Sequence, residues 1–236
     1  VIRKLQNHKV DTRYIRQVPD GMGTWLAVFD NEGDVVASIS KRPNLMPILD
    51  ILEKNGDEIF SQADSIVIEV DMDKAIVKKY GKPVFGVVAN MSIGLERRDF
   101  LKELSAFVCN SQEAGLLFCT DFSGLTPEEL ADVISEKVIQ ARIPKLVVTV
   151  GAQGAVYADM DGDKGVCPAR AVEVKDTTGA GDSFCAGLAV GLTYGKSLRE
   201  ACEIGTHLAA SVIVTTENVC PRFLPRELGL DIDVAD

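Results

Sequence analysis

The chain has 236 residues, 46% of them hydrophobic and 25% charged, which suits one α/β domain or one domain with a small addition. Its formal net charge of -10 argues against nucleic acid as a partner, because an acidic surface repels a phosphate backbone. No apolar run approaches the roughly 20 residues that a membrane-spanning helix needs, so neither a membrane partner nor a secretory leader is expected.

The first predicted element is a β-hairpin. Apolar runs at Trp25–Phe29 and Val35–Ile39 flank the polar segment Asp30–Asp34, which contains Asn and Gly as a tight turn would. We therefore divide the chain into a hairpin at residues 21–40 and an α/β domain formed by residues 1–20 and 41–236.

Beyond Pro43 the chain alternates between strand-like and helix-like segments. Apolar runs of strand length occur at residues 65–70, 84–88, 106–109 and 146–150, and helical patterns lie between them. Fully apolar strands that alternate with helices are typical of a parallel sheet covered on both faces. Residues 73–80 leave room for only about two helical turns, so either this crossover is unusually short or residues are missing from the segment.

Three helices are predicted in more detail. Thr126, Pro127 and Glu129 form a capping-box pattern ahead of a helix, and the spacing of Ser197 and Glu200 repeats that pattern. A third helix, at residues 181–194, is rich in small and apolar residues, which indicates a buried helix packed closely against a sheet.

The six cysteines predict where the protein works. They are Cys109, Cys119, Cys167, Cys185, Cys202 and Cys220. Because none forms a CxxC pair, we expect free thiols in a reducing, cytoplasmic environment and no zinc site.

The segment Asp176-Thr-Thr-Gly-Ala-Gly-Asp-Ser-Phe184 carries the strongest chemical signal. Gly179, Ala180 and Gly181 let the backbone turn tightly at a helix start, where amide groups and the helix dipole attract an anion. Asp182 follows in the first turn, where a carboxylate can accept a proton from a hydroxyl that attacks a phosphate. The alternative is a glycine-rich turn without chemistry.

This segment resembles the C-terminal signature of the ribokinase, or PfkB carbohydrate kinase, family. Two more segments resemble family motifs in the expected order: Asn110-Ser-Gln-Glu113 and Thr149-Val-Gly-Ala-Gln-Gly154. The resemblance implies a ribokinase-like three-layer α/β/α domain with a mostly parallel central sheet, over which the hairpin at residues 21–40 forms a small β lid. It runs from Val10 to Pro221 and lacks the family's initial strand and Gly-containing segment, which hold much of the sugar site.

The resemblance also implies a role for each motif. Asp182 is the expected catalytic base, assisted by Gly179, Ala180 and Gly181. Asn110 and Glu113 organise Mg²⁺ around the phosphates of ATP. The remaining nucleotide-binding residues are Thr149, Gly151, Gly154 and His207. Each of these sites has an alternative interpretation. Residues 110–113 could be an ordinary helix start, and residues 149–154 could be a turn between strands. His207 could be a helix histidine that binds no ligand.

Asp176 and the carbonyl of Thr178 match positions that bind a monovalent cation, K⁺, in some members. Those members supply further ligands from a glycine-containing loop after the last helix, and the corresponding residues 216–221 contain no glycine. This difference argues against potassium activation.

The activity that the resemblance implies is transfer of the ATP γ-phosphate to a hydroxymethyl group of a sugar or nucleoside. The hairpin looks most like the lids of pseudouridine kinase-like members, and ribose and fructose-like acceptors stay open. Trp25 on this hairpin favours contact with a ligand or with a second copy. Family members are often dimers through the lid, so the resemblance implies a homodimer, with which Trp25 is consistent. The alternative function is a catalytically silent sensor of a sugar or nucleoside.

Overall fold

The computed structural model describes residues 1–19, 23–29, 35–41, 44, 46–69, 80–87, 98–221 and 223–231. Within them the chain forms two compact units, Val1–Gln62 and Ala63–Asp236, and each is described by itself. The boundaries expected from the sequence, with a separate hairpin at residues 21–40, stay a prediction.

The first unit contains the predicted hairpin. Strands β1 (Thr24–Phe29) and β2 (Val35–Lys41) pair antiparallel, and the turn between them lies outside the described residues. Leu26 faces Ile39 across the strands, and these side chains are 64% and 73% exposed. Since directly opposed residues share a face of the sheet, that face is apolar. Trp25 faces Ser40 on the other side and is exposed as well, and the homodimer through this hairpin stays a prediction. The unit also contains α1 (Ile2–Asn7) and α2 (Met46–Ser61).

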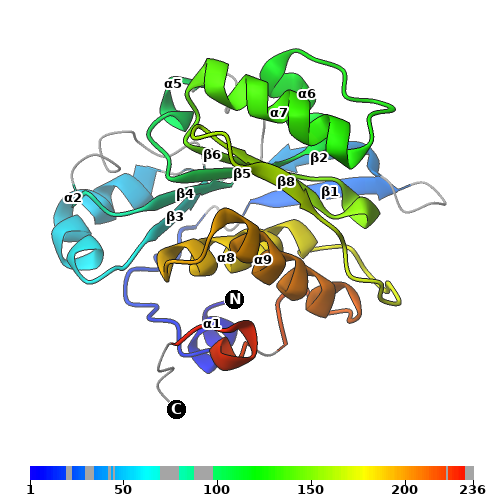
Figure 1. The fold of residues 1–236 in the computed structure, drawn as a ribbon. Coiled ribbons are helices and arrows are strands. Elements are labelled where there is room, and N and C mark those ends of the chain that lie inside the picture. Colours follow the sequence, from blue (N-terminus) through cyan, green and yellow to red (C-terminus); the bar gives the residue numbers. More distant parts are fainter. Residues whose placement is uncertain are drawn as a thin grey trace. The chain divides into compact units, whose positions relative to one another are not determined.

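A six-stranded sheet in the order β3-β4-β5-β6-β7-β8 forms the centre of the second unit (Figure 1). Its strands are β3 (Ile66–Glu69), β4 (Val84–Val87), β5 (Ala106–Asn110), β6 (Lys145–Thr149), β7 (Ala155–Asp159) and β8 (Lys164–Cys167). The first four are parallel, β7 runs antiparallel to β6, and β8 runs antiparallel to β7 and so has the direction of the first four. The four strands predicted from apolar runs are therefore confirmed, and they run side by side as expected.

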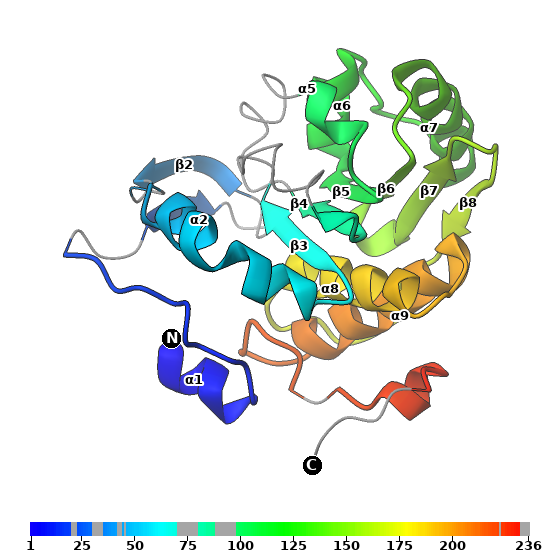
Figure 2. The same ribbon diagram turned by 90° about the vertical axis from the view of Figure 1, so that its left-hand side faces the viewer.

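Helices cover both faces of this sheet, as Figures 1 and 2 show. One face carries α5 (Arg98–Leu101), α6 (Ser111–Phe118) and α7 (Pro127–Ala141), and the other carries α8 (Ala180–Thr193) and α9 (Leu198–Ile213). Two short 3₁₀ turns, η1 (Gly151–Gln153) and η2 (Pro225–Leu228), complete the elements. The predicted three-layer α/β/α architecture with a mostly parallel sheet is confirmed.

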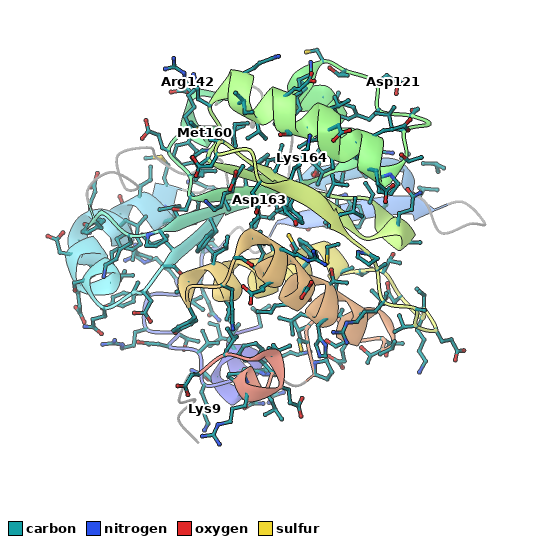
Figure 3. The ribbon with its side chains drawn as sticks, in the orientation of Figure 1. Lys9, Asp121, Arg142, Met160, Asp163 and Lys164 are labelled. Atoms are coloured by element: carbon teal, nitrogen blue, oxygen red, sulfur yellow. The ribbon has the colours of Figure 1, made fainter. Side chains whose placement is uncertain are left out.

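Helix α7 shows how the sequence fixes one of these layers. The Thr126 hydroxyl accepts a hydrogen bond from the Glu129 amide, and the Glu129 carboxylate accepts one from the Thr126 amide, so the predicted capping box is present. Leu130 and Ile134 bury the inner face of the helix. At its outer edge Asp132 pairs with Lys164 of β8 at 2.9 Å, and Lys164 is labelled in Figure 3.

The small residues of α8 serve its contact with α9. A Cβ built on Gly187 would lie 2.7 Å from the Gly205 Cα, and one built on Gly205 would lie 2.7 Å from the Phe184 carbonyl oxygen. Both distances are far shorter than van der Waals contact, so the two helices approach this closely only because these positions are glycine. Phe184 and Leu188 of α8 also belong to the core beneath the sheet. The sequence predicted close packing on the sheet, and the structure adds a close contact with the neighbouring helix.

Three further expectations concern the cysteines, membrane-spanning helices and the crossover at residues 73–80. All six cysteines lie in the described residues, and none of them forms a disulfide. Among the described helices, none combines the length and apolar character that crossing a membrane requires. The short crossover predicted at residues 73–80 lies outside the described residues except for Tyr80.

Candidate active site

Two of the predicted motifs follow neighbouring strands. Asn110 ends β5 and Thr149 ends β6, and these residues are partners in the parallel register. The Thr149 hydroxyl also donates to the carbonyl of Cys109 at 3.5 Å. The carboxyl edge of a parallel sheet is where α/β proteins bind ligands, so the topology brings the predicted metal and nucleotide motifs together at a suitable place.

The Asn110–Glu113 motif forms a helix cap. The Glu113 amide donates to Asn110 Oδ1 at 2.8 Å, and Glu113 Oε2 accepts from the Asn110 amide at 2.7 Å. Burial raises the pKa of the Glu113 carboxyl, and the hydrogen bond from Asn110 opposes that shift. Oε1 of Glu113 accepts no hydrogen bond from the described residues. The helix-start alternative is therefore present, and one carboxylate oxygen is still available for a water bound to Mg²⁺, a hard cation that keeps several waters.

The two glycines of the Thr149–Gly154 motif serve different purposes. A Cβ on Gly154 would lie 2.1 Å from the Cys167 carbonyl oxygen and 2.6 Å from the Ala169 nitrogen, so Gly154 allows the chain after β8 to pass against it. A Cβ on Gly151 would meet nothing within 4 Å. The motif is thus the turn between β6 and β7, with one glycine needed for packing and the other facing open space.

The glycine-rich segment begins α8 without a side-chain cap. Gly179 is the N-cap residue and adopts φ 83°, ψ 0°, a left-handed conformation. The Ala180 amide donates to the Thr177 carbonyl at 3.1 Å. In the described part of the chain, the amides of Gly179, Gly181 and Asp182 have no acceptor. Unpaired amides at the positive end of a helix dipole can attract an anion, and the anion site itself stays a prediction.

A cavity of about 490 Å³ joins the glycine-rich segments. Thr149, Gly151 and Gly154 line it from the β6–β7 turn, and Ala180 and Gly181 line it from the start of α8. Ala152 of the same β6–β7 turn adds to this wall. The rest is largely apolar and comes from the chain after β8 and from α8 and α9: Ala169, Arg170, Ala171, Val172, Val174, Thr177, Phe184, Thr206, Ala209, Ala210 and Ile213. An apolar slot that meets unpaired helix amides at one end suits a nucleotide.

Asp182 is exposed in the first turn of α8, directly after the lining residue Gly181. One turn further on, Cys185 is buried, and burial together with the charge of Asp182 raises the pKa of its thiol to about 12. The thiol therefore stays protonated at neutral pH, and the carboxylate of Asp182 is the group there that can accept a proton.

His207 does not line this cavity. It lies on α9 in a second cavity of about 320 Å³, whose wall also includes Arg170, Lys196, Glu203 and Glu227. Burial and the nearby charge of Arg170 lower the pKa of His207, so its imidazole is uncharged at pH 7. Its role near the adenine stays a prediction, with the helix-histidine alternative still open.

The predicted monovalent-cation residues form a local turn. Asp176 Oδ1 accepts from the Thr178 amide at 2.8 Å, and hydrogen bonds with Thr178 lower the pKa of the Asp176 carboxyl. The loop after α9 passes beside this turn, because a Cβ on Gly179 would lie 2.5 Å from the Asn218 carbonyl oxygen. Potassium binding stays a prediction here.

Sequence reasoning missed Arg170 and the wall that α9 provides. Arg170 lies between β8 and the glycine-rich segment, and it lines both cavities. The only signal was a single basic side chain among the alanines Ala169 and Ala171 shortly before the motif. Nothing in the local pattern says that α9 packs opposite this segment.

Comparison with known proteins identifies the family. The profile described as "pfkB family carbohydrate kinase" matches residues 1–223. The guanosine-inosine kinase of Exiguobacterium acetylicum is 34% identical over 227 residues, which cover 92% of this chain and 74% of that enzyme.

Solved structures agree on the fold. The nucleoside kinase of Burkholderia thailandensis in complex with inosine has a TM-score of 0.70 at 19% identity, and the match covers 93% of this chain and 71% of that chain. Ribokinase from Thermotoga maritima has a TM-score of 0.62 at 22% identity, and the match covers 83% of this chain and 64% of that chain.

The profile match and the 34% identical relative confirm the family that the three motifs predicted. They confirm the predicted class of enzyme with it, since ATP-dependent kinases of sugars and nucleosides make up this family. The chain belongs to the pfkB family of carbohydrate kinases.

Proposed function

We propose that this protein transfers the γ-phosphate of ATP to a hydroxymethyl group of a nucleoside, with Asp182 as the base. One observation carries the proposal. The 490 Å³ cavity is lined by both glycine-containing motifs, and Asp182 comes directly after the lining residue Gly181 in the chain. A phosphate at the unpaired amides of α8 would thus lie next to a carboxylate, as phosphoryl transfer requires.

The proposed chemistry uses groups of this chain. Asp182 takes the proton of the attacking hydroxyl, and the amides of Gly179 and Gly181 stabilise negative charge on the phosphate in transit. A Mg²⁺ ion accompanying ATP would neutralise phosphate charge, and Glu113 would hold its waters through the available Oε1.

Relatives guide the choice of acceptor. The 34% identical relative is a guanosine-inosine kinase, and the nucleoside kinase of similar fold was solved with inosine. These names support a purine nucleoside as the first acceptor to test. Pseudouridine, ribose and fructose-like sugars, which the sequence left open, follow in the same assay.

The test is MgATP-dependent ADP release with guanosine, inosine, pseudouridine, ribose and fructose, for the wild type and Asp182→Asn. We expect release with a purine nucleoside and a loss of about 10²–10⁴ in rate in the variant, because a positioned base contributes about that much. ATP binding should persist, since the substitution changes only the charge. Glu128→Gln, which removes another exposed first-turn carboxylate on α7, is the matched control and should keep full activity.

The results of this assay distinguish the kinase, the role of Asp182 as its base, and the sensor function. Full activity in Asp182→Asn would remove Asp182 as the base. ATP binding without ADP release for any acceptor would favour the sensor function, and absence of ATP binding would contradict the kinase proposal itself.

A further inference from the structure

We infer that Arg170 contacts the base of the nucleotide, with its guanidinium lying flat against the purine ring of ATP. This inference rests on the proposed function, because it assumes that the 490 Å³ cavity holds ATP. It adds a specificity-determining residue to the site.

The composition of the cavity wall singles out Arg170. Among the described residues that line the cavity it alone is charged, in a chain with a formal net charge of -10. Its side chain is exposed and forms no ion pair with any described residue. Because no described residue pairs with this exposed guanidinium, it is available to a ligand that enters the apolar slot.

Helix α9 shows at which end of the cavity Arg170 lies. The Ile213 carbonyl accepts hydrogen bonds from the amides of Lys175 and Asp176, which places the glycine-rich segment at that end of the helix. Near the middle of α9, Thr206 Oγ1 lies 3.3 Å from the sulfur of Cys167, three residues before Arg170. Ile213 lies seven positions along the helix from Thr206, about 10 Å at 1.5 Å per residue. A nucleotide with its phosphates at Gly181 would therefore extend its base toward Arg170.

The chemistry beside Arg170 suits a planar ring. Ala169 and Ala171 flank Arg170, and Ala209 and Ala210 lie between Thr206 and Ile213 on α9, so all four offer small apolar surfaces along the cavity. A guanidinium is planar and weakly hydrated, and it stacks on aromatic faces in a way that an ammonium group cannot. The neighbouring His207 is uncharged at pH 7, so it does not repel Arg170.

The second cavity provides a rival position for the side chain. Glu203 and Glu227 line it together with Arg170. Glu203 is already engaged with Arg199 at 3.3 Å. Lys196 lines this second cavity and not the first, so it is a matched cation for a control.

The experiment compares two probes by isothermal titration calorimetry, MgATP and Mg²⁺-tripolyphosphate, which lacks the base. The proteins are the wild-type chain, Arg170→Ala, Arg170→Lys and the control Lys196→Ala. We expect Arg170→Ala to weaken ATP binding about 2- to 30-fold, the range that a cation–π contact supplies between exposed and desolvated sites, and to leave tripolyphosphate unchanged. Arg170→Lys should recover part of the loss, and Lys196→Ala should bind both probes as the wild type does.

Three results would overturn the inference. Equal losses for ATP and tripolyphosphate would assign Arg170 to a phosphate. Unchanged ATP binding in Arg170→Ala would show that the guanidinium stays with the carboxylates of the second cavity. If Lys196→Ala weakened ATP binding as much as Arg170→Ala, the loss would reflect the removal of any nearby positive charge and not a contact with the base. In all three cases the wild type still binds ATP, whereas a wild type that binds no ATP would overturn the proposed function and this inference together.

Discussion

Helices α9 and α8 lie side by side beneath the same sheet, yet they begin in opposite ways (Figure 2). At α9, the hydroxyl of Ser197 accepts from the Glu200 amide, and the Glu200 carboxylate accepts from the Ser197 amide at 2.8 Å. At α8, Gly179 offers no side chain, and the amides of Gly181 and Asp182 have no acceptor in the described part of the chain. One helix satisfies its first turn internally, and the other leaves it open to a ligand.

The contrast shows that a helix start without a side-chain cap gives up stability and leaves its amides available to a ligand. Side-chain caps contribute about 1 kcal/mol of stability, and α6, α7 and α9 all have one. Helix α8 gives up that contribution at the place where the cavity lies. Stability and ligand binding should therefore respond separately to substitutions at these helix starts.

The largest expected effect is on activity, at Gly181. A Cβ there would meet nothing within 4 Å, and Gly181 lines the cavity, so alanine fits the fold and projects into the space for the phosphate. Alanine also favours a helix over glycine by about 1 kcal/mol. We expect Gly181→Ala to unfold at the same or a higher temperature and to lose about 10²-fold in kcat/KM, because a displacement of about 1 Å at a reacting group costs that much.

Differential scanning calorimetry and steady-state kinetics on the same sample test this pair of effects. A variant that keeps wild-type kcat/KM would mean that no ligand approaches the start of α8. A variant that melts at a lower temperature would mean that Gly181 is needed by the fold instead.

The next effect is on stability, at Gly179. Its φ of 83° is unfavourable for alanine, and a Cβ would lie 2.5 Å from the Asn218 carbonyl oxygen, so both the backbone and the space require glycine. We expect Gly179→Ala to lower the free energy of unfolding by about 1–3 kcal/mol, the usual cost of a strained backbone conformation, with activity falling too as the turn shifts.

Ser197→Ala is the control for Gly179→Ala. Removing this cap should cost about 1 kcal/mol and leave kcat/KM unchanged, because α9 begins away from the cavity. Urea denaturation gives both free energies. Equal losses of activity in the two variants would show that any destabilised helix start harms the site, and the contrast between α8 and α9 would disappear.

The features that the sequence predicted well are local ones. The capping boxes of Thr126 and Ser197 depend on residues three apart, and the strands depend on short apolar runs, so both could be recognised without knowing the fold. The glycine-rich segment was recognised for the same reason. Its unpaired amides follow from the absence of a capping side chain at Gly179, which the sequence itself displays.

The features that escaped prediction depend on contacts between distant segments. Arg170 reaches the cavity only because α9 packs opposite the chain after β8, and the close approach of Gly187 and Gly205 helps to set the position of α9. The packing of α9 also places His207 at the second cavity. No local pattern encodes how two helices meet, so these positions required the structure.

The smallest expected effect is on the pH dependence of stability, and it contrasts two capping carboxylates. Hydrogen bonds from Ser197 lower the pKa of Glu200, whereas burial raises the pKa of Glu113 above the ordinary glutamate value of 4.5. The stabilisation from ionised Glu200 is present above about pH 4.5 and is lost as the pH falls through its folded pKa. For Glu113 the sign is opposite: ionisation costs the fold stability, so the wild type loses stability as the pH rises above about 4.5 through the raised pKa.

Thermal denaturation without nucleotide, from about pH 3.5 to 7, would show both signs when the wild type is compared with Glu200→Gln and Glu113→Gln. The difference between wild type and Glu200→Gln should grow with pH, and the difference between wild type and Glu113→Gln should shrink. Glu129→Gln, whose carboxyl also has a lowered pKa through Thr126, should follow Glu200→Gln. If the difference in stability between wild type and Glu113→Gln also grew with pH, the ionised Glu113 carboxylate would be one more stabilising cap. A shrinking difference would mean that α6, like α8, keeps a helix start that costs stability, as expected of a carboxylate retained for a metal ion and its waters.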